Sequence, residues 1–288
     1  MRIIPAFCFV FLLSIAFIRC SDDGKPATAG QNALATDEAT IGVQLWSFRL
    51  FPVETAVLKA DSSGLRHIET FFGQPVFKDL KDSFGIGLSP EARSRLRSFL
   101  AEKGIKMVSA YASAAKDRQE WIKTFELAKD FDLSYITVEP LKEHWDLIDS
   151  LGGIYGIKIA LHEHARGRSL YWHPDTVIAA MTNRPNIGAC ADIGHWGRSG
   201  LDPVSSLAKL EGRIWGVHLK DINEFNNIDA EDVVVGHGVF DFPAIFAELE
   251  RQQFRGMITI EREGNWENNV PDIRETVKYY KNERKKLK

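Results

Sequence analysis

Cysteine is scarce in this sequence, with three among 288 residues. Cys8 and Cys20 both lie near the N-terminus, so only Cys190 remains in the rest of the chain. A lone cysteine cannot close an intramolecular disulfide, which excludes a disulfide-stabilised scaffold. Cys190 stands inside an apolar segment typical of a buried strand, and we therefore expect an inert, buried thiol rather than a nucleophile.

An excess of positive charge is also missing. The chain has 36 Lys and Arg against 39 Asp and Glu, a net charge of −3. Because binding to phosphates requires a basic face, this balance argues against nucleic acid as a partner. A content of 44% hydrophobic and 26% charged residues is ordinary for a soluble globular protein. The length is compatible with a single α/β barrel, a fold that often takes about 250 residues.

Long hydrophobic runs are absent except near the N-terminus. There, residues 3–18 are mostly apolar and follow Arg2. This run is short for a membrane span and has the right size for the core of a signal peptide. Cys20 follows, and then a polar stretch; this order resembles a bacterial lipoprotein signal, although Arg19 stands where a small residue is usual. We predict a signal peptide over 1–20, a flexible linker over 21–39, and export to the periplasm or cell surface. A lipid anchor at Cys20 is the expectation, and a plain cleaved signal peptide is the alternative.

From residue 40 onward, short apolar runs alternate with segments of helical period. One helix is bounded by Ser89 and Pro90 at its start and Gly104 at its end. Eight such strand–helix units predict a single (β/α)8 TIM barrel over 40–288. An open doubly wound sheet would need a glycine-rich turn after its first strand, and 47–54 has no glycine. The predicted strands are 41–48, 65–72, 105–112, 135–140, 157–164, 186–193, 214–221 and 256–263.

Acidic and imidazole side chains stand at the ends of four predicted strands: Glu139, Asp192, His218 and Glu261. In a TIM barrel these strand ends meet at one mouth, where the chemistry takes place. Burying charges together costs several kcal/mol unless they are paired, and a cation between them removes that cost. The oxygen-rich set suits Mn²⁺, Mg²⁺ or Co²⁺ at least as well as Zn²⁺.

Five motifs carry a resemblance to a known family. They are "ITVEPL" (136–141), "ADIGH" (191–195), "VHLKD" (217–221), "GHGVFDF" (236–242) and "ITIERE" (258–263). The sequence from 41 onward resembles the xylose-isomerase-like TIM-barrel superfamily, which includes sugar epimerases, sugar isomerases and inosose dehydratases. The resemblance implies that Glu139, Asp192, His218 and Glu261 are ligands of a divalent metal. It also implies that His195 reaches substrate oxygens.

Further candidates for substrate binding lie near the same strand ends: Lys220, His162, His164 and Trp46. For Lys220 the alternative is a strand-end lysine that reaches for solvent. One of the two histidines could instead orient a ligand by a hydrogen bond. Epimerases of the family place an arginine a few residues after the histidine of the seventh strand, whereas this chain has Glu224 near that point. The long segments 73–88 and 222–239 are candidates for lids over the mouth.

These residues predict an enzyme that removes a proton from the carbon next to a carbonyl. A metal that polarises the carbonyl lowers the pKa of that C–H bond, and Glu139 and Glu261 are the candidate bases. The resulting enediolate leads to epimerisation or isomerisation, or to elimination by a lyase or hydratase. Predicted export, and the lack of a glycine loop for phosphate, favour a non-phosphorylated sugar or a keto-glycoside as substrate. A non-catalytic sugar-binding lipoprotein is a further alternative, and a homodimer is a possible assembly.

Overall fold

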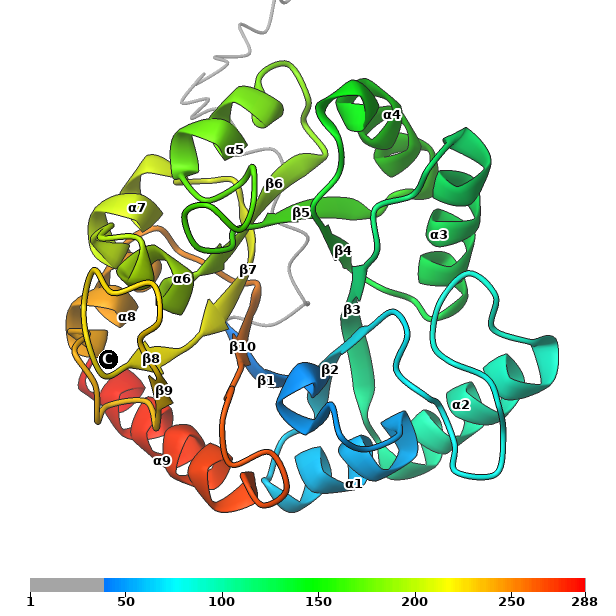
Figure 1. The fold of residues 1–288 in the computed structure, drawn as a ribbon, viewed down its shortest axis with the longest axis horizontal. Helices are drawn as coiled ribbons and strands as arrows, with labels where there is room; N and C mark the ends of the chain where they lie inside the picture. The colour runs from blue at the N-terminus through cyan, green and yellow to red at the C-terminus, as the bar shows by residue number, and fades with distance from the viewer. Residues whose placement is uncertain (1–38, 288) are drawn as a thin grey trace, which may run out of the picture.

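The computed structural model describes residues 39–287, which form a closed barrel of eight parallel strands surrounded by helices (Figure 1). The barrel closes between its first and last strands, where Thr40 pairs with Met257 and Val43 with Ile260. The predicted fold is therefore confirmed. The strands are β1 (Thr40–Gln44), β2 (His67–Phe71), β3 (Lys106–Ala112), β4 (Tyr135–Val138), β5 (Lys158–His162), β6 (Ile187–Asp192), β7 (Ile214–Leu219) and β10 (Met257–Ile260).

The helices form the outer ring (Figure 1). The predicted capping is confirmed: the Ser89 hydroxyl accepts a hydrogen bond from Ala92 N at 3.2 Å, and Gly104 ends the helix with φ at 61°. The helices are α1 (Val53–Ser62), α2 (Pro90–Lys103), α3 (Arg118–Asp130), α4 (Trp145–Tyr155), α5 (Pro174–Met181), α6 (Ile193–Arg198), α7 (Pro203–Lys209), α8 (Phe242–Arg251) and α9 (Val270–Lys286), with short 3₁₀ turns at Leu45–Phe48 and Lys142–His144.

Two buried layers hold the barrel together. Outward-facing strand side chains pack against the helices and form the large apolar core. A smaller cluster fills part of the barrel, and Cys190 lies in it with Tyr135 and Trp215. The Cys190 side chain is fully buried and forms no disulfide, as the sequence predicted. Such a packed interior leaves the open end of the barrel as the place for polar side chains.

Several strands are shorter than predicted, because they end just before the polar residues of the mouth. The prediction of a strand over 41–48 is wrong for its second half, where residues 45–48 form a 3₁₀ turn. The Gln44 side chain accepts a hydrogen bond from Trp46 N at 3.1 Å and so draws the backbone out of the sheet. Glu139, Lys220 and Glu261 likewise each follow the last paired residue of a strand.

Both predicted lid segments contain ordered structure. Within 222–239, the strand β9 (Asp232–Val233) pairs antiparallel with β8 (Asp221–Ile222). Within 73–88, Pro75 and Ser83 form an isolated antiparallel bridge. Both segments follow strands at the mouth of the barrel.

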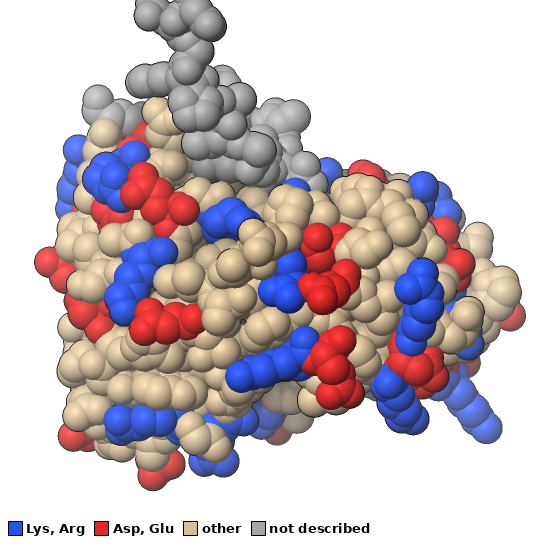
Figure 2. Space-filling model, turned by 90° about the horizontal axis from the view of Figure 1, so that it is seen from above, with Lys and Arg blue, Asp and Glu red and all other residues tan. Residues whose placement is uncertain are grey.

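The predicted signal peptide, Cys20 and all but the last residue of the predicted linker lie outside the described residues. Within 39–287, no helix is both long and apolar enough to cross a membrane. On the face shown in Figure 2, acidic and basic side chains are interspersed. We therefore see no large region of a single charge sign on that face.

Candidate metal centre and active site

Three of the four predicted metal ligands lie together at the mouth. The cluster consists of Asp192, His218, Glu261 and, in addition, His162, and all four residues are buried. Their donor atoms all lie within 4.8 Å of one another. His218 Nδ1 is 2.9 Å from Glu261 Oε2 and 3.5 Å from Asp192 Oδ2. His162 Nε2 lies 3.4 Å from that same Asp192 oxygen. Two imidazoles and two carboxylates therefore converge on one small volume.

The two carboxylate oxygens of Asp192 have different roles: one caps a helix and the other faces the cluster. It is the N-cap of α6, and its Oδ1 accepts a hydrogen bond from His195 N at 3.0 Å. This bond explains the spacing of three between Asp192 and His195, because an N-cap side chain reaches the third residue of its helix. The other oxygen, Oδ2, faces the cluster and has no hydrogen-bond partner of good geometry among the described residues.

Glu69 fixes the orientation of the His218 ring. Its carboxylate is fully buried inside the barrel and accepts a hydrogen bond from His218 Nε2 at 2.9 Å. The Gln44 amide donates to the same Glu69 oxygen at 2.6 Å, and hydroxyl groups donate to the other. Burial acts to lower the pKa of His218, but the acidic groups around the ring outweigh burial and raise that pKa well above its ordinary value. A bound cation would displace the proton on Nδ1, and with the other proton held on Nε2 the ring would then present its Nδ1 lone pair to the cluster.

A divalent cation fits this arrangement. Asp192 Oδ2 and Glu261 Oε2 are both buried and make no hydrogen bond of good geometry among the described residues, although nitrogens of Lys220 and His218 lie near them. A bound cation would satisfy these oxygens. Burial acts to raise the pKa of Asp192 and Glu261, but nearby cationic groups, Lys220 among them, outweigh burial and hold each pKa well below its usual range. Both carboxylates are therefore ionised at neutral pH. Oxygen and imidazole donors are typical of Mn²⁺, Co²⁺ or Zn²⁺, and Mg²⁺ would rely on the oxygens.

Glu139, the fourth predicted ligand, lies in an adjoining cluster with His162 and His164. Its Oε1 accepts a hydrogen bond from the Tyr111 hydroxyl at 2.8 Å, lies 3.3 Å from His162 Nδ1, and is also hydrogen-bonded to His164 Nδ1. Burial acts to raise the pKa of Glu139, but the contacts with the two histidines outweigh burial and lower it. His162 therefore touches both clusters, and ligation of the metal by Glu139 stays a prediction.

Lys220 is buried beside the cluster rather than exposed to solvent. Its Nζ lies 3.2 Å from Asp192 Oδ2, 3.3 Å from Glu261 Oε2 and 2.5 Å from Glu263 Oε1. Burial acts to lower the pKa of Lys220, but these carboxylates outweigh it and raise the pKa well above the ordinary value. The group is therefore an ammonium, which can only donate hydrogen bonds.

His195 contacts this ammonium with one ring nitrogen, and its other ring nitrogen is buried. Its Nε2 lies 3.4 Å from Lys220 Nζ. Burial lowers the pKa of His195 well below its usual value, so the ring is neutral. Because Nε2 accepts from the ammonium, the ring proton sits on Nδ1, which has no hydrogen-bond partner among the described residues. The His195 ring lies at the mouth, and its role in substrate binding stays a prediction.

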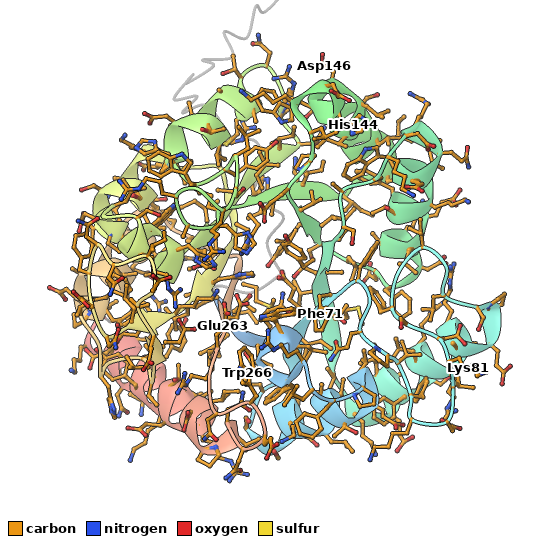
Figure 3. All side chains as sticks on the ribbon, in the orientation of Figure 1. Phe71, Lys81, His144, Asp146, Glu263 and Trp266 are labelled. Atoms are coloured by element: carbon orange, nitrogen blue, oxygen red, sulfur yellow. The ribbon has the colours of Figure 1, made fainter. Side chains whose placement is uncertain are left out.

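A cavity of about 480 Å³ opens above the clusters. Trp46 lines it and packs edge to face on Phe71 with ring centroids 5.0 Å apart. Figure 3 shows Phe71, Glu263 and Trp266 around this mouth. Four predicted substrate-binding residues line the cavity, namely Trp46, His162, His164 and His195, while Lys220 lies just beneath.

Comparison with protein families matches residues 57–283 to the xylose isomerase-like TIM barrel family. The chain belongs to this family. An uncharacterized protein from Parabacteroides distasonis is 31% identical in sequence, with a TM-score of 0.70 over 86% of this chain and 99% of that one.

Two inosose dehydratases are among the relatives of this xylose isomerase-like barrel. The enzyme of Geobacillus thermodenitrificans is 28% identical over 87% of this chain and 89% of its own length. That of Clostridium beijerinckii is 29% identical over 42% of this chain, and the match spans only 48% of that relative. The chain is similar in sequence to both of these enzymes.

Sequence reasoning missed several residues of this xylose isomerase-like site. Glu69 was visible only as a polar residue inside a strand pattern. Tyr111 and Phe71 occupy strand positions where an aromatic residue usually indicates core, yet both line the cavity. Arg168 also lines it, from the segment after β5, and no sequence signal marks it. Glu263 could have been found, since it follows Glu261 at the two-residue spacing of a strand face.

Proposed function

We propose that this protein is a divalent-metal-dependent lyase that removes water from a non-phosphorylated keto-sugar or keto-polyol. The observation that carries the proposal is the pairing of carboxylate bases with fixed proton donors around one buried cation site. A cation held by Asp192, His218 and Glu261 would polarise a substrate carbonyl and acidify the adjacent C–H bond. The similarity to inosose dehydratases supports elimination as the outcome.

Elimination needs a base that removes a proton from one carbon and an acid that protonates the hydroxyl leaving the next carbon. Glu261 and Glu139 are the candidate bases, and both are held ionised by their neighbours. One of them takes the proton from the carbon beside the carbonyl, giving an enediolate. Its electron pair then forms the new double bond as the hydroxyl on the next carbon leaves. That hydroxyl takes a proton from a donor and departs as water.

The site offers the proton donors that such a step needs. The Lys220 ammonium lies beside Glu261, and the His164 ring is hydrogen-bonded to Glu139. The His195 ring lines the cavity, and we assign it to a hydrogen bond that stabilises negative charge on a substrate oxygen. Base and acid are thus available on each side of the mouth.

Epimerisation is the second candidate, and one observation favours it. Glu139 follows β4 and Glu261 follows β10, which lie opposite each other in the barrel order. Two carboxylates on opposite faces of a substrate can remove a proton from one face and return it to the other.

One experiment distinguishes these reactions. The purified protein, supplied with Mn²⁺, is incubated in D₂O with a panel of inososes and keto-sugars, and the products are followed by NMR and mass spectrometry. A dehydratase gives a product lighter by one water, whereas an epimerase gives a deuterated isomer of unchanged composition. Absence of both exchange and elimination on every compound, with the metal bound, would overturn the proposed function and favour a non-catalytic sugar-binding role.

A further inference from the structure

A second hollow adjoins the catalytic cavity. It has a volume of about 610 Å³ and lies between the 73–88 segment and the residues that follow β3. Phe72 and Ser113 line both this hollow and the catalytic cavity. The two spaces therefore meet at these side chains. The 73–88 segment runs outward from β2 toward α2, with Lys81 far from the barrel centre (Figure 3).

The walls of this second hollow are held in place by the fold. Gly73 N donates to Phe84 O and Phe84 N donates to Gln74 O, each at 2.8 Å. The Phe84 ring packs edge to face on Phe72, with centroids 5.9 Å apart. Gly85, with φ at 150°, brings its backbone against the same Phe72 ring, where a Cβ would lie 3.6 Å away. The hollow is thus preformed, which lowers the entropy that a ligand loses on binding.

The lining chemistry indicates a neutral, hydroxyl-rich occupant. Asp82 and Glu120 offer carboxylate oxygens as acceptors, and Ser83 and Ser113 offer hydroxyls. Lys81 is the single cationic side chain of the lining, so a phosphate would meet more negative than positive charge. The Phe72 ring supplies an apolar face of the kind that packs against sugar C–H groups.

We propose that this hollow is the subsite for a second sugar unit, so that the substrate is a glycoside. The keto ring occupies the cavity above Asp192, His218 and Glu261, and the linked sugar extends across Phe72 into the second hollow. This inference rests on the proposed function for the identity of the first ring. In this proposal the second sugar unit supplies binding energy far from the reacting carbon. An enzyme can use such binding energy to position the reacting carbon.

The test compares a short and a long substrate in the same enzyme. The short one is a methyl keto-glucoside, and the long one is the keto-disaccharide in which glucose replaces the methyl group. The blocking variant is Ala114→Trp, because Ala114 is exposed and lines only the second hollow. The matched control is Ala208→Trp, an exposed position on α7. Binding of unoxidised cellobiose and of methyl glucoside is measured in parallel by calorimetry, independently of turnover.

We expect the disaccharide to have at least a tenfold higher kcat/KM than the methyl glycoside, about the effect of one or two added hydrogen bonds. Ala114→Trp should remove that advantage, and it should weaken binding of cellobiose more than binding of methyl glucoside. Ala208→Trp should behave as the parent. Equal kcat/KM for the two substrates, or cellobiose binding unaffected by Ala114→Trp, overturns the subsite. If neither sugar reacts but cellobiose binding depends on Ala114, the subsite stands and the proposed reaction fails.

Discussion

Glu69 Oε1 accepts a hydrogen bond from His218 Nε2 across 2.9 Å, in the closed interior of the barrel. Neither residue is exposed. The bond joins β2 to β7, strands that are not neighbours in the barrel. It fixes which nitrogen of His218 faces Asp192 and Glu261. A carboxylate in this position behind a ligand histidine raises its basicity and holds its orientation.

The first prediction concerns this bond. Glu69→Gln should weaken Mn²⁺ affinity by about 10–100-fold, because the amide no longer holds the proton on His218 Nε2 with a charged acceptor. Calorimetric titration of the metal-free protein with Mn²⁺ measures the change. Thr137→Val is the matched control, since it removes one hydrogen bond to Glu69 and leaves the contact with His218. Equal affinities for the Glu69→Gln variant and the parent would count against this role.

The second prediction separates the two functions of Asp192. Saturating metal should raise the melting temperature of the parent, because a ligand that binds only the folded state stabilises it. Both Asp192→Asn and Asp192→Ala should largely lose that rise. Without metal, Asp192→Ala should be less stable than Asp192→Asn by about 1 kcal/mol, since asparagine still caps α6. Calorimetric melts with and without Mn²⁺ check this, and full metal stabilisation in both variants would exclude Asp192 as a ligand.

The third prediction concerns the two glutamates. With metal restored, Glu139→Gln and Glu261→Gln should each slow C–H exchange by about 10²–10⁴-fold, because the amide keeps the shape but cannot accept a proton. Exchange into D₂O is followed by NMR, and the metal content of each variant is measured so that a binding defect is not mistaken for a catalytic one. Exchange at the parent rate in both fully loaded variants would exclude a two-glutamate mechanism and make His162 or His164 the next base to test.

The fourth prediction concerns the glycine of the "ADIGH" motif. A Cβ at Gly194 would lie 2.7 Å from Lys220 Cβ and 3.0 Å from its Cδ, closer than such atoms can approach. Gly194→Ala should therefore displace the Lys220 stem, lower stability by about 1–3 kcal/mol and reduce turnover. Chemical denaturation and steady-state kinetics measure both effects.

Gly153→Ala is the control for Gly194→Ala. Gly153 lies inside α4, and a Cβ there would have its nearest neighbour, Asn186 Nδ2, at 3.4 Å. That variant should gain up to about 1 kcal/mol from improved helix propensity. Equal stability and turnover of Gly194→Ala and the parent would show that the Lys220 stem has room to move.

The fifth prediction concerns Cys190. Burial raises the pKa of its thiol to about 12, and the side chain is fully shielded from solvent. In the folded protein Cys190 should therefore resist iodoacetamide from pH 7 to pH 9, and it should react readily once the chain is denatured. Peptide mapping by mass spectrometry distinguishes it from Cys8 and Cys20. Stoichiometric alkylation of the folded protein at pH 8 would contradict the buried position.

The architecture of this protein could be predicted from its amino-acid sequence. The alternation of short apolar runs with helical segments is repeated eight times, which predicts a parallel sheet covered on both faces, and the glycine-free turn after the first strand favoured a barrel over an open doubly wound sheet. Asp192, His218 and Glu261 could be assigned to the mouth for the same reason, because the fold requires every strand to end there. Cap residues such as Ser89 and Gly104 act locally, and their effects were therefore readable without the tertiary structure.

The contacts between side chains from different strands could not be predicted from the sequence. Glu69 lies 149 residues from His218 in the sequence, and no local pattern encodes their hydrogen bond. The closed barrel places His162 between the Glu139 cluster and the Asp192 cluster, and it buries Lys220 beside Glu261. The strand ends also differ from the prediction: β1 ends at Gln44, whose side chain accepts a hydrogen bond from Trp46 N. The spacing of apolar residues along the chain shows whether a segment is a helix or a strand. Contacts across a barrel depend instead on how the barrel closes and on the register of its strands.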